Sequence, residues 1–302
     1  MKERFIRFGI LFFSLFSNHL VAQLDQCKGV PIYMTKMGFN PEQSYISTSE
    51  RNVMGLVIMQ SDQPGNPRAK IIKSAQAPSW KKWGYLGAIT TDEHGNSYIL
   101  PAAKVNMLYN KVEYQNTIYK LDAMSGELQQ FISLPMEIKP GAKNPFGLLG
   151  SFYDCSNHLL IVSTVAGSDE KKERGKVYIV DPIKKTYKVI FENKDFYGLA
   201  VHVHEGKKFL FLSSARSGDL YSVEVDQMNQ PIGNLKKEFS INGIGLRGDD
   251  RIRKIRFTGT GQMILNTVLF YYNLTAPSEE QVGRFTYQWN KEKKTWELLK
   301  VE

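Results

Sequence analysis

A half-unit of about a dozen residues occurs five times along the chain, and this repetition restricts the possible folds more than any other feature. Each copy has a polar turn, then an apolar or alternating run, then small polar residues. The copies are NPEQSYISTS (40–49), DEHGNSYILPA (92–102), YDCSNHLLIVSTV (153–165), HEGKKFLFLSSA (204–215) and TGTGQMILNTV (258–268). Pairs such as Ser163-Thr164 and Ser213-Ser214 fall at equivalent places. Alternating runs between polar turns predict β-strands.

A hairpin follows each half-unit. The hairpins are NTIYKLDAMSGELQQFISL (116–134), GKVYIVDPIKKTYKVIFE (175–192) and GDLYSVEVDQMNQPIGNLKKEFS (218–240), with looser copies at 55–74 and 283–300. Asp or Asn starts each hairpin turn, because a short oxygen-bearing side chain can hydrogen-bond the turn backbone. Each unit therefore holds four antiparallel strands in roughly 55 residues. The sequence predicts an all-β fold, a β-propeller of four-stranded antiparallel blades with five repeats visible, or six blades if one is too degenerate to see. A β-sandwich would not place turn residues at matching positions.

The N-terminus predicts export. Lys2, Arg4 and Arg7 precede the apolar stretch GILFFSLFS (9–17), and Ala22 offers a cleavage site. We therefore expect residues 1–22 to be a signal peptide that is removed, and residues 23–302 to form a single propeller domain in the periplasm or outside the cell. The apolar stretch is too short for a transmembrane helix, and no later segment is long enough.

The two cysteines, Cys27 and Cys155, permit one disulfide in an exported protein. Cys155 is expected in a turn inside one repeat and Cys27 lies near the mature start, so nothing in the sequence brings them together.

The net charge of +9 is spread along the chain, with small clusters such as KKERGK (171–176) and RGDDRIRKIR (247–256). This pattern predicts a solvated surface, with acidic glycans or a membrane surface as possible partners, and no motif indicates nucleic acid.

The strand pattern GKVYIVDPIKKTYKVI and the preceding FYGLAV…GKKFLFLSS resemble the senescence marker protein/gluconolactonase-like propellers, related to strictosidine synthase-like and NHL-repeat propellers. The resemblance implies a lactonase with a divalent ion in the central tunnel, held by an Asn before a Gly-Leu-Ala-like strand start and an Asp ending the next strand. In this chain Tyr197 stands at the Asn position, and Ser213 or Ser214 stands at the Asp position. Phe146 precedes the glycine of the preceding unit. Hard cations need oxygen ligands, so the resemblance supports the fold more than the metal-dependent activity.

Ligands of propellers usually meet one face, built by the loops between blades and between the second and third strands. In this chain those loops carry aromatic residues with Lys and Arg nearby, which suits sugars, aromatic ligands or another protein. The candidate ligand-binding residues are Trp80, Trp83, Tyr85, Tyr109, Tyr197, Arg216, Arg247, Arg251 and Tyr271. The aromatic residues among them would equally fill the wedges between blades.

Two further sequence patterns concern metal binding and glycosidase chemistry. His202 and His204 lie on one strand face, but a metal site needs a third ligand and the equivalent strands are variable, so an ordinary strand face is predicted. The paired carboxylates of a propeller glycosidase would come from Asp195, Asp219, Asp249 and Glu50, whose separations the sequence leaves open. No catalytic residue is assigned.

The sequence therefore predicts an exported, non-catalytic binding module that takes a small molecule, glycan or protein at its loop face, without a metal or cofactor. The alternative is a lactonase-like hydrolase with an atypical site, acting on a lactone or sugar-derived substrate with Ca²⁺ or another divalent ion. Carboxylates that converge at the tunnel mouth would favour the hydrolase, and an aromatic or basic groove would favour the binding module.

Overall fold

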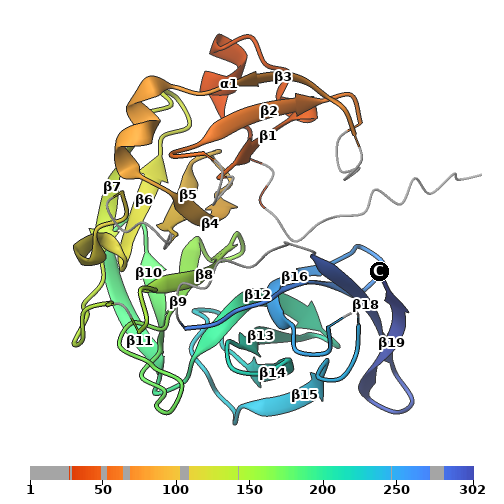
Figure 1. Cartoon of the computed structure of the whole chain (residues 1–302). Helices are drawn as coiled ribbons and strands as arrows, with labels where there is room; N and C mark the ends of the chain where they lie inside the picture. The colour runs from red at the N-terminus through yellow and green to blue at the C-terminus, as the bar shows by residue number, and fades with distance from the viewer. Residues whose placement is uncertain are drawn as a thin grey trace, which may run out of the picture.

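The computed structural model describes residues 27, 29–48, 53–63, 69–102, 109–141, 143–245, 247–272 and 282–302. These residues form five antiparallel sheets arranged around a common centre as the blades of a propeller (Figure 1). The predicted all-β propeller is confirmed, and the number of blades is five. The predicted signal peptide, residues 1–22, lies outside the described residues.

The strands of each blade follow one another in chain order. Blade 1 contains β1 (Ser44–Ser47), β2 (Val57–Ser61) and β3 (Ile71–Ala75), and blade 2 contains β4 (Leu86–Thr91), β5 (Ser97–Pro101), β6 (Thr117–Leu121) and β7 (Leu128–Ser133). Blade 3 contains β8 (Leu148–Asp154), β9 (Leu159–Thr164), β10 (Lys176–Asp181) and β11 (Thr186–Glu192). Blade 4 contains β12 (Phe196–His204), β13 (Lys207–Ser214), β14 (Asp219–Glu224) and β15 (Lys236–Ser240). Blade 5 contains β16 (Arg251–Phe257), β17 (Gln262–Val268), β18 (Gly283–Asn290) and β19 (Thr295–Val301). The short helices are α1 (Ile32–Lys36), η1 (Pro41–Gln43), η2 (Pro78–Trp83) and η3 (Val112–Tyr114).

Blade 1 differs from the other four, because its described residues supply three strands. β1 ends at the pair Ser47-Thr48, which corresponds in the repeat to Ser163-Thr164 at the end of β9, the second strand of blade 3. β1 thus holds a second-strand position, and α1 and η1 precede it where the other blades have their first strand. The described part of the central tunnel is therefore lined by the first strands of four blades, β4, β8, β12 and β16.

Neighbouring first strands approach each other closely at glycines. A Cβ atom at Gly198 of β12 would lie 2.9 Å from the carbonyl oxygen of Ile252 in β16. Ser213 Oγ accepts a hydrogen bond from the Gly198 N–H (2.7 Å) and donates one to the Ile252 carbonyl (2.5 Å). Ser163 accepts the equivalent hydrogen bond from Gly150 one blade earlier (3.1 Å). The small polar pairs of the repeat thus join each of these blades to the next.

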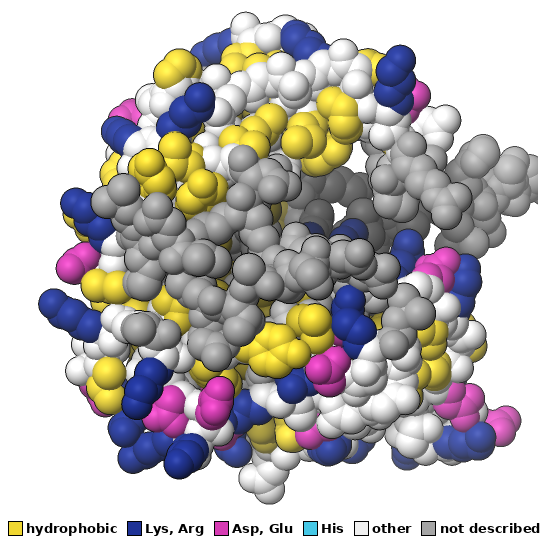
Figure 2. Space-filling model, in the orientation of Figure 1, with side chains coloured by type: hydrophobic (Ala, Val, Ile, Leu, Met, Phe, Trp, Pro, Cys, Tyr) yellow, Lys and Arg dark blue, Asp and Glu magenta, His cyan; other side chains and the backbone are white. Residues whose placement is uncertain are grey.

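Hydrophobic clusters fill the wedges between consecutive blades, from blade 1 to blade 5. Between blades 4 and 5, for example, Phe211 packs against Phe257 and Trp296. Within the described residues no such cluster joins blade 5 back to blade 1. In the space-filling view the surface is hollowed between these two blades, and Lys or Arg side chains are visible inside the hollow (Figure 2).

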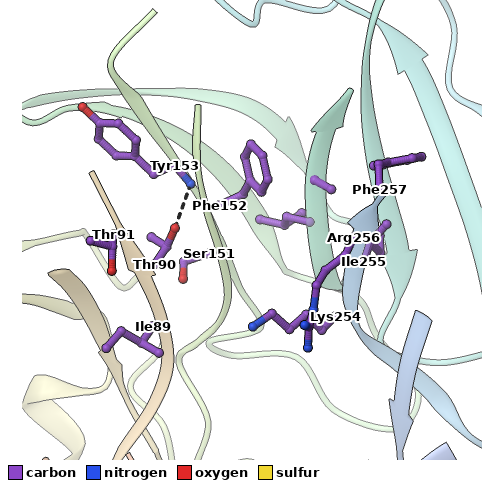
Figure 3. Close-up of a pocket in the computed structure, with 12 residues that line it drawn as sticks. Ile89, Thr90, Thr91, Ser151, Phe152, Tyr153, Lys254, Ile255, Arg256 and Phe257 are labelled. Atoms are coloured by element: carbon purple, nitrogen blue, oxygen red, sulfur yellow. Dashed lines mark hydrogen bonds between the residues drawn. The ribbon is translucent and has the colours of Figure 1, made fainter. Parts of the chain in front are cut away.

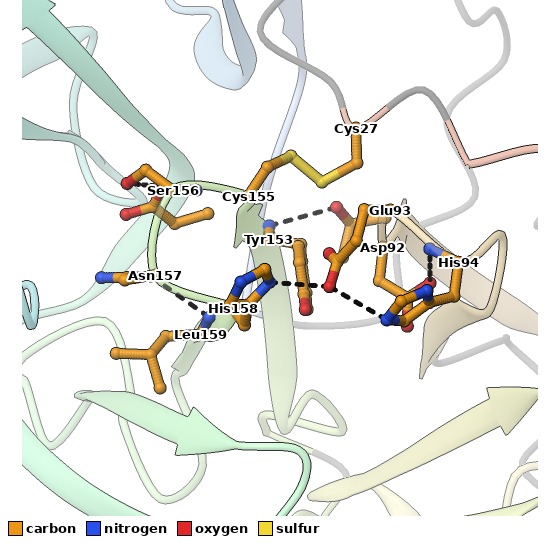
Figure 4. The surroundings of a disulfide bond; sticks show 12 residues. Cys27, Asp92, Glu93, His94, Tyr153, Cys155, Ser156, Asn157, His158 and Leu159 are labelled. Carbon is orange, nitrogen blue, oxygen red and sulfur yellow. Dashed lines mark hydrogen bonds and ion pairs between the residues drawn. A yellow bond between two sulfur atoms is a disulfide. The ribbon is translucent and has the colours of Figure 1, made fainter.

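A disulfide ties the N-terminal segment to blade 3. Cys27 is bonded to Cys155 in the turn between β8 and β9, with 5.7 Å between the Cα atoms (Figure 4). The segment then passes the turns of blade 2, where the Tyr33 N–H donates to the Ala123 carbonyl (3.0 Å). The two cysteines are 128 residues apart in sequence, and only the closing of the blades brings them together. None of the helices in the described ranges has the length and apolar character needed to cross a membrane.

Candidate functional site

The connections of the propeller define two faces. The loop face carries the connections between blades and those between second and third strands, such as the described residues 109–116 and 269–272. The turn face carries the short hairpin turns, such as residues 182–185 and 205–206. The central tunnel runs between the two faces, and its two parts differ in chemistry.

Aromatic rings from three blades meet at the loop-face end of the tunnel. Phe270, which follows β17, lies 5.1 Å from the Phe146 ring before β8, 5.2 Å from the Tyr197 ring of β12 and 5.4 Å from the Tyr272 ring. Phe270, Tyr197 and Tyr272 are each buried. These four rings form a hydrophobic cluster, which we call the aromatic cap.

A buried carboxylate anchors the aromatic cap. Asp195 Oδ2 accepts hydrogen bonds from the Tyr272 hydroxyl (2.6 Å) and from Arg216 Nε (3.0 Å). Asp195 Oδ1 accepts from Ser168 Oγ (2.6 Å) and from the Gly175 N–H (2.9 Å). Arg216 also lies over the Tyr272 ring, 4.9 Å from its centroid. Burial, together with the negative charge of Asp195, raises the pKa of the Tyr272 hydroxyl, so this hydroxyl stays protonated and donates.

The aromatic cap occupies the positions where the family resemblance implies ion ligands. Tyr197 and Phe146 present rings that pack on Phe270. The hydroxyl of Ser213 is used by the backbone of β12 and β16, and the hydroxyl of Ser214 accepts from the N–H groups that follow it. These residues do not fit a hard cation, which requires oxygen ligands and usually carboxylates. The part of the chain that the structure describes contains no cluster of three His, Cys, Asp or Glu residues suited to a metal ion.

The two candidate tryptophans lie between blades 1 and 2. Trp80 is 1% exposed, packs against Tyr33 and donates from Nε1 to the Gly126 carbonyl (2.9 Å). Trp83 donates to the Leu128 carbonyl (2.9 Å) and packs on Tyr119. Trp80 is therefore part of the core rather than of an accessible surface, because the wedge between two blades must be filled with apolar volume.

Three candidate tyrosines lie on the loop face. Tyr85 contacts Tyr109 edge to face, with 6.4 Å between the ring centroids, and Tyr109 is 49% exposed. Tyr271 is 48% exposed, next to the buried Tyr272, and its hydroxyl lies 3.5 Å from Asp249 Oδ2. Tyr109 and Tyr271 are thus available for contact with a ligand.

Arg247, before β16, and Arg251, its first residue, interact with the loop that precedes the strand. Arg247 Nε pairs with Asp250 Oδ1 at 2.6 Å. Arg251 donates to the carbonyls of Asp249 and Asp250, while its Nε is buried without a hydrogen-bond partner. Both side chains help to hold residues 247–250 on the loop face.

The histidine pair packs between blades 4 and 5. The His202 ring stacks on Phe257 with 3.9 Å between the centroids, and His204 lies 4.2 Å from the Trp289 ring. Burial lowers the pKa of His204, so it is neutral at physiological pH. Both histidines therefore contribute to the packing between blades 4 and 5.

The candidate carboxylates of a glycosidase have separate partners. Asp195 belongs to the aromatic cap, Asp219 pairs with Lys237 on β15 (2.8 Å), and Asp249 lies beside Tyr271. Glu50 lies outside the described residues.

A cavity lies between the first strands, closer to the turn face than the aromatic cap. It has a volume of about 520 Å³, part of it open to solvent, and is lined by residues of β4, β8, β12 and β16 (Figure 3). Its apolar walls include Ile89, Phe152 and Leu199, and its polar groups include Thr90 and Ser151.

Two cations from β16 enter this cavity. Lys254 and Arg256 lie two residues apart on one face of the strand and extend toward β8 and β4 (Figure 3). Burial and the nearby positive charges of Arg256 and Arg253 lower the pKa of the Lys254 amine to about 8. The Lys254 side chain is nevertheless exposed to the open part of the cavity, although protein surrounds it on most sides.

Sequence reasoning interpreted Lys254 and Arg256 only as part of a solvated charge cluster. The available signal was their place in the repeat: they immediately precede the TGTG turn (258–261), in the first strand of the unit. First strands line the tunnel, so cations that alternate along one of them face its interior. The aromatic cap was also not predicted as a unit, since its rings come from loops of three blades.

The comparisons with known proteins carry no argument about the fold or the site. No protein-family model matches the chain, and no curated protein matches it. One chain of a nidogen/laminin complex is similar, with 10% identity and a TM-score of 0.45 over 78% of this chain and 83% of that chain. An endo-arabinase from Bacteroides thetaiotaomicron has 10% identity and a TM-score of 0.41, over 68% of this chain and 76% of that one. A Bacteroides ovatus xyloglucan GH43B protein has 10% identity and a TM-score of 0.43, over 72% of this chain and 40% of that one. The class of protein, a five-bladed β-propeller, rests on the sheets themselves.

Proposed function

We propose that this chain is an exported, non-catalytic binding module that takes a small molecule, a glycan or a protein through its loop face. The observation that carries the proposal is the aromatic cap, which occupies the place where a lactonase would hold its ion. Phe146, Tyr197 and Phe270 fill that place with rings, and Arg216 is held beside them by Asp195. The exposed rings of Tyr109 and Tyr271 offer contact area on the same face.

Exposed aromatic rings beside cationic groups suit sugar faces and protein side chains, because a rigid ring buries much apolar area at a small entropic cost. Catalysis of lactone opening would instead need a polarising ion or a positioned acid–base pair. The described carboxylates near the loop face are already used in structural contacts, such as Asp195 with Tyr272 and Asp250 with Arg247.

The test compares binding and turnover in the same protein. The mature chain is screened by thermal shift against oligosaccharides, and its hits are titrated by calorimetry, while lactone hydrolysis is measured with and without Ca²⁺, Zn²⁺ and Mn²⁺. We expect Tyr271→Ala or Tyr109→Ala to weaken the binding of a hit about tenfold, a loss of about 1.4 kcal/mol that is typical of an aromatic contact residue. The melting temperature should change little, because both side chains are exposed.

Tyr187→Ala is the matched control. Tyr187 is 44% exposed but lies at the start of β11, next to a turn-face hairpin, so its removal should leave loop-face binding unchanged. Ion-dependent lactone turnover would contradict the proposal and favour the hydrolase. An equal loss of binding affinity in Tyr271→Ala and Tyr187→Ala would contradict binding at the loop face.

A further inference from the structure

The central cavity has a chemistry of its own, separate from the loop face. We propose that the cavity between the first strands binds a small organic anion, whose carboxylate or phosphate oxygens lie between Lys254 and Arg256. This inference goes beyond the proposed function, because it assigns a second site and a class of ligand to it.

The cations of this cavity lack counter-charges. No Asp or Glu is among the described residues that line it. Lys254 makes neither an ion pair nor a hydrogen bond within the described part of the chain, and Arg256 makes one long hydrogen bond, from Nη2 to Asn266 Oδ1 (3.3 Å). Arg256 Nε is buried with no partner. By contrast, the buried Lys208 is paired with Asp154 at 2.6 Å.

Such an arrangement is costly without a ligand. Two like charges in a protein-lined space repel each other and lose part of their hydration. A bound anion would offset both costs, because it attracts the cations and accepts their hydrogen bonds. The lowered pKa of Lys254 has these same causes, burial first and the neighbouring arginines second. Burial, together with the charge of Arg284 on β18, also lowers the pKa of Arg256. An anion between the two groups would therefore raise the pKa of Lys254 back toward its ordinary value.

Hydroxyl groups face the cations across the cavity. Thr90 Oγ1 on β4 accepts from the Tyr153 N–H (3.2 Å), so its own hydroxyl hydrogen remains available to donate (Figure 3). Ser151 Oγ on β8 is buried and has no hydrogen-bond partner. Together with Lys254 and Arg256, these groups offer donors from three strands to one set of oxygen atoms.

The remaining walls define the rest of the ligand. Ile89, Phe152 and Leu199 are apolar and come from β4, β8 and β12. The space between these walls is partly open to solvent, so it can receive the charged group of a small molecule while the rest of the molecule extends outward. It is too small for a folded chain. The combination of cationic groups with apolar walls selects an organic anion over a free inorganic ion.

The experiment uses the mature, disulfide-bonded chain and three probes of similar shape: benzoate, phenyl phosphate and the uncharged benzyl alcohol. Calorimetric titration at pH 7 in a low-chloride buffer should show binding of benzoate, phenyl phosphate or both, and at least tenfold weaker binding of benzyl alcohol. Which of the two anions binds more tightly distinguishes a carboxylate site from a phosphate site. Absence of binding by both anions, or equal binding of benzyl alcohol, would overturn the inference.

Variants assign the binding to the cavity. Lys254→Met should weaken anion binding at least tenfold, and Lys254→Arg, which keeps the charge, should retain it within about threefold. The matched control is Lys237→Met, which removes a lysine on the outer strand β15. Equal losses in Lys254→Met and Lys237→Met would show non-specific charge attraction and would refute the site.

A second measurement does not depend on the folding of any variant. Lysine side-chain NMR of the wild-type protein should show one amine with a pKa near 8, and saturating benzoate or phenyl phosphate should raise that pKa. Anion affinity should fall as pH rises above 8, because Lys254 then loses its charge. Among the described residues, the other charged or titratable groups around Lys254 are Arg253 and Arg256 on β16, Arg284 on β18 and Tyr153 on β8. The arginines stay protonated in this range, and burial raises the pKa of Tyr153 above it. A lysine pKa that does not move with the anion would contradict the inference.

Discussion

The two faces of strand β16 differ in chemistry: one is apolar and packed, and the other is cationic and lines a cavity. On one face Ile255 and Phe257 pack in the wedge between blades 4 and 5, where Phe257 contacts His202 and Phe211 of blade 4 and Trp296 of blade 5. On the other face Lys254 and Arg256 enter the central cavity without a counter-charge in the described residues. One face contributes to stability by packing, and the other presents charge that only a ligand would compensate.

The comparison shows how a repeat fold separates stability from function. Because side chains alternate along a strand, one short segment, RIRKIRF (251–257), supplies both surfaces. The packing face belongs to the hydrophobic cluster between blades 4 and 5, which resembles the clusters between the preceding blades. The cavity face lies toward the side where, within the described residues, no hydrophobic cluster joins blade 5 to blade 1.

The largest expected effect is on the packing face. Phe257→Ala should lower the free energy of unfolding by about 3–5 kcal/mol, because a fully buried ring is replaced by a cavity. Urea denaturation followed by tryptophan fluorescence measures this change. Phe257→Leu, which refills most of the volume, should cost much less. A loss below about 1 kcal/mol for the alanine variant would mean that the wedge between blades 4 and 5 repacks, and the comparison would fail.

A substitution on the cavity face should change the free energy of unfolding in the opposite direction. Lys254→Met removes an uncompensated charge and keeps most of the side-chain volume, so in ligand-free protein it should leave stability unchanged or raise it. The gain should be about 1 kcal/mol or less, since the amine is open to solvent and its electrostatic cost is partly screened. The same urea titration measures this change, with Lys188→Met on the outer strand β11 as the control, because Lys188 is exposed. A marked destabilisation specific to Lys254→Met would show that Lys254 has a structural partner.

The smallest expected effect is the change of folding stability with pH, and it tests the charge of Lys254 most directly. The pKa of Lys254 is about 8 in the folded protein and about 10.4 in an unfolded chain, so between these values the unfolded state binds more protons. The stability contributed at this site therefore rises with pH from about 8 to 10. Below pH 8 the lysine is charged in both states, and its cost is constant. We expect any advantage of Lys254→Met over wild type to be greatest near pH 7 and to shrink by pH 10, measured as the difference in melting temperature. A difference that is independent of pH would mean that the Lys254 pKa is not lowered.

The fold was predictable from the sequence because its signals are local. The turn aspartates hydrogen-bond their own backbone, as Asp181 does with the N–H groups of Ile183 and Lys184, so they mark each hairpin wherever it lies. The repeated serines were recognised as equivalent, and Ser213 shows why: its hydroxyl joins two first strands. Local chemistry of this kind leaves a pattern that can be counted along the chain. Five repeats are visible in it, while the choice between five and six blades required the structure.

The site was less predictable because it is assembled from distant segments. The aromatic cap combines Phe146, Tyr197 and Phe270 from three blades, and sequence reasoning named only Tyr197 as a contact residue. Trp80 was a candidate for the loop face, but it lies in the wedge between blades 1 and 2. A tryptophan in an interblade connection has the same local sequence whether its ring points inward or outward.

The sequence by itself determined the period of the fold, the strand and turn order and the alternation along each strand, because backbone hydrogen bonding and side-chain direction depend on neighbouring residues. Only the tertiary structure decided that Cys27 reaches Cys155, that four aromatic rings form the aromatic cap, and that Lys254 and Arg256 face a cavity whose described lining has no carboxylate. These outcomes depend on how the blades close around a common centre. Closure is a property of the whole ring, which no single repeat encodes.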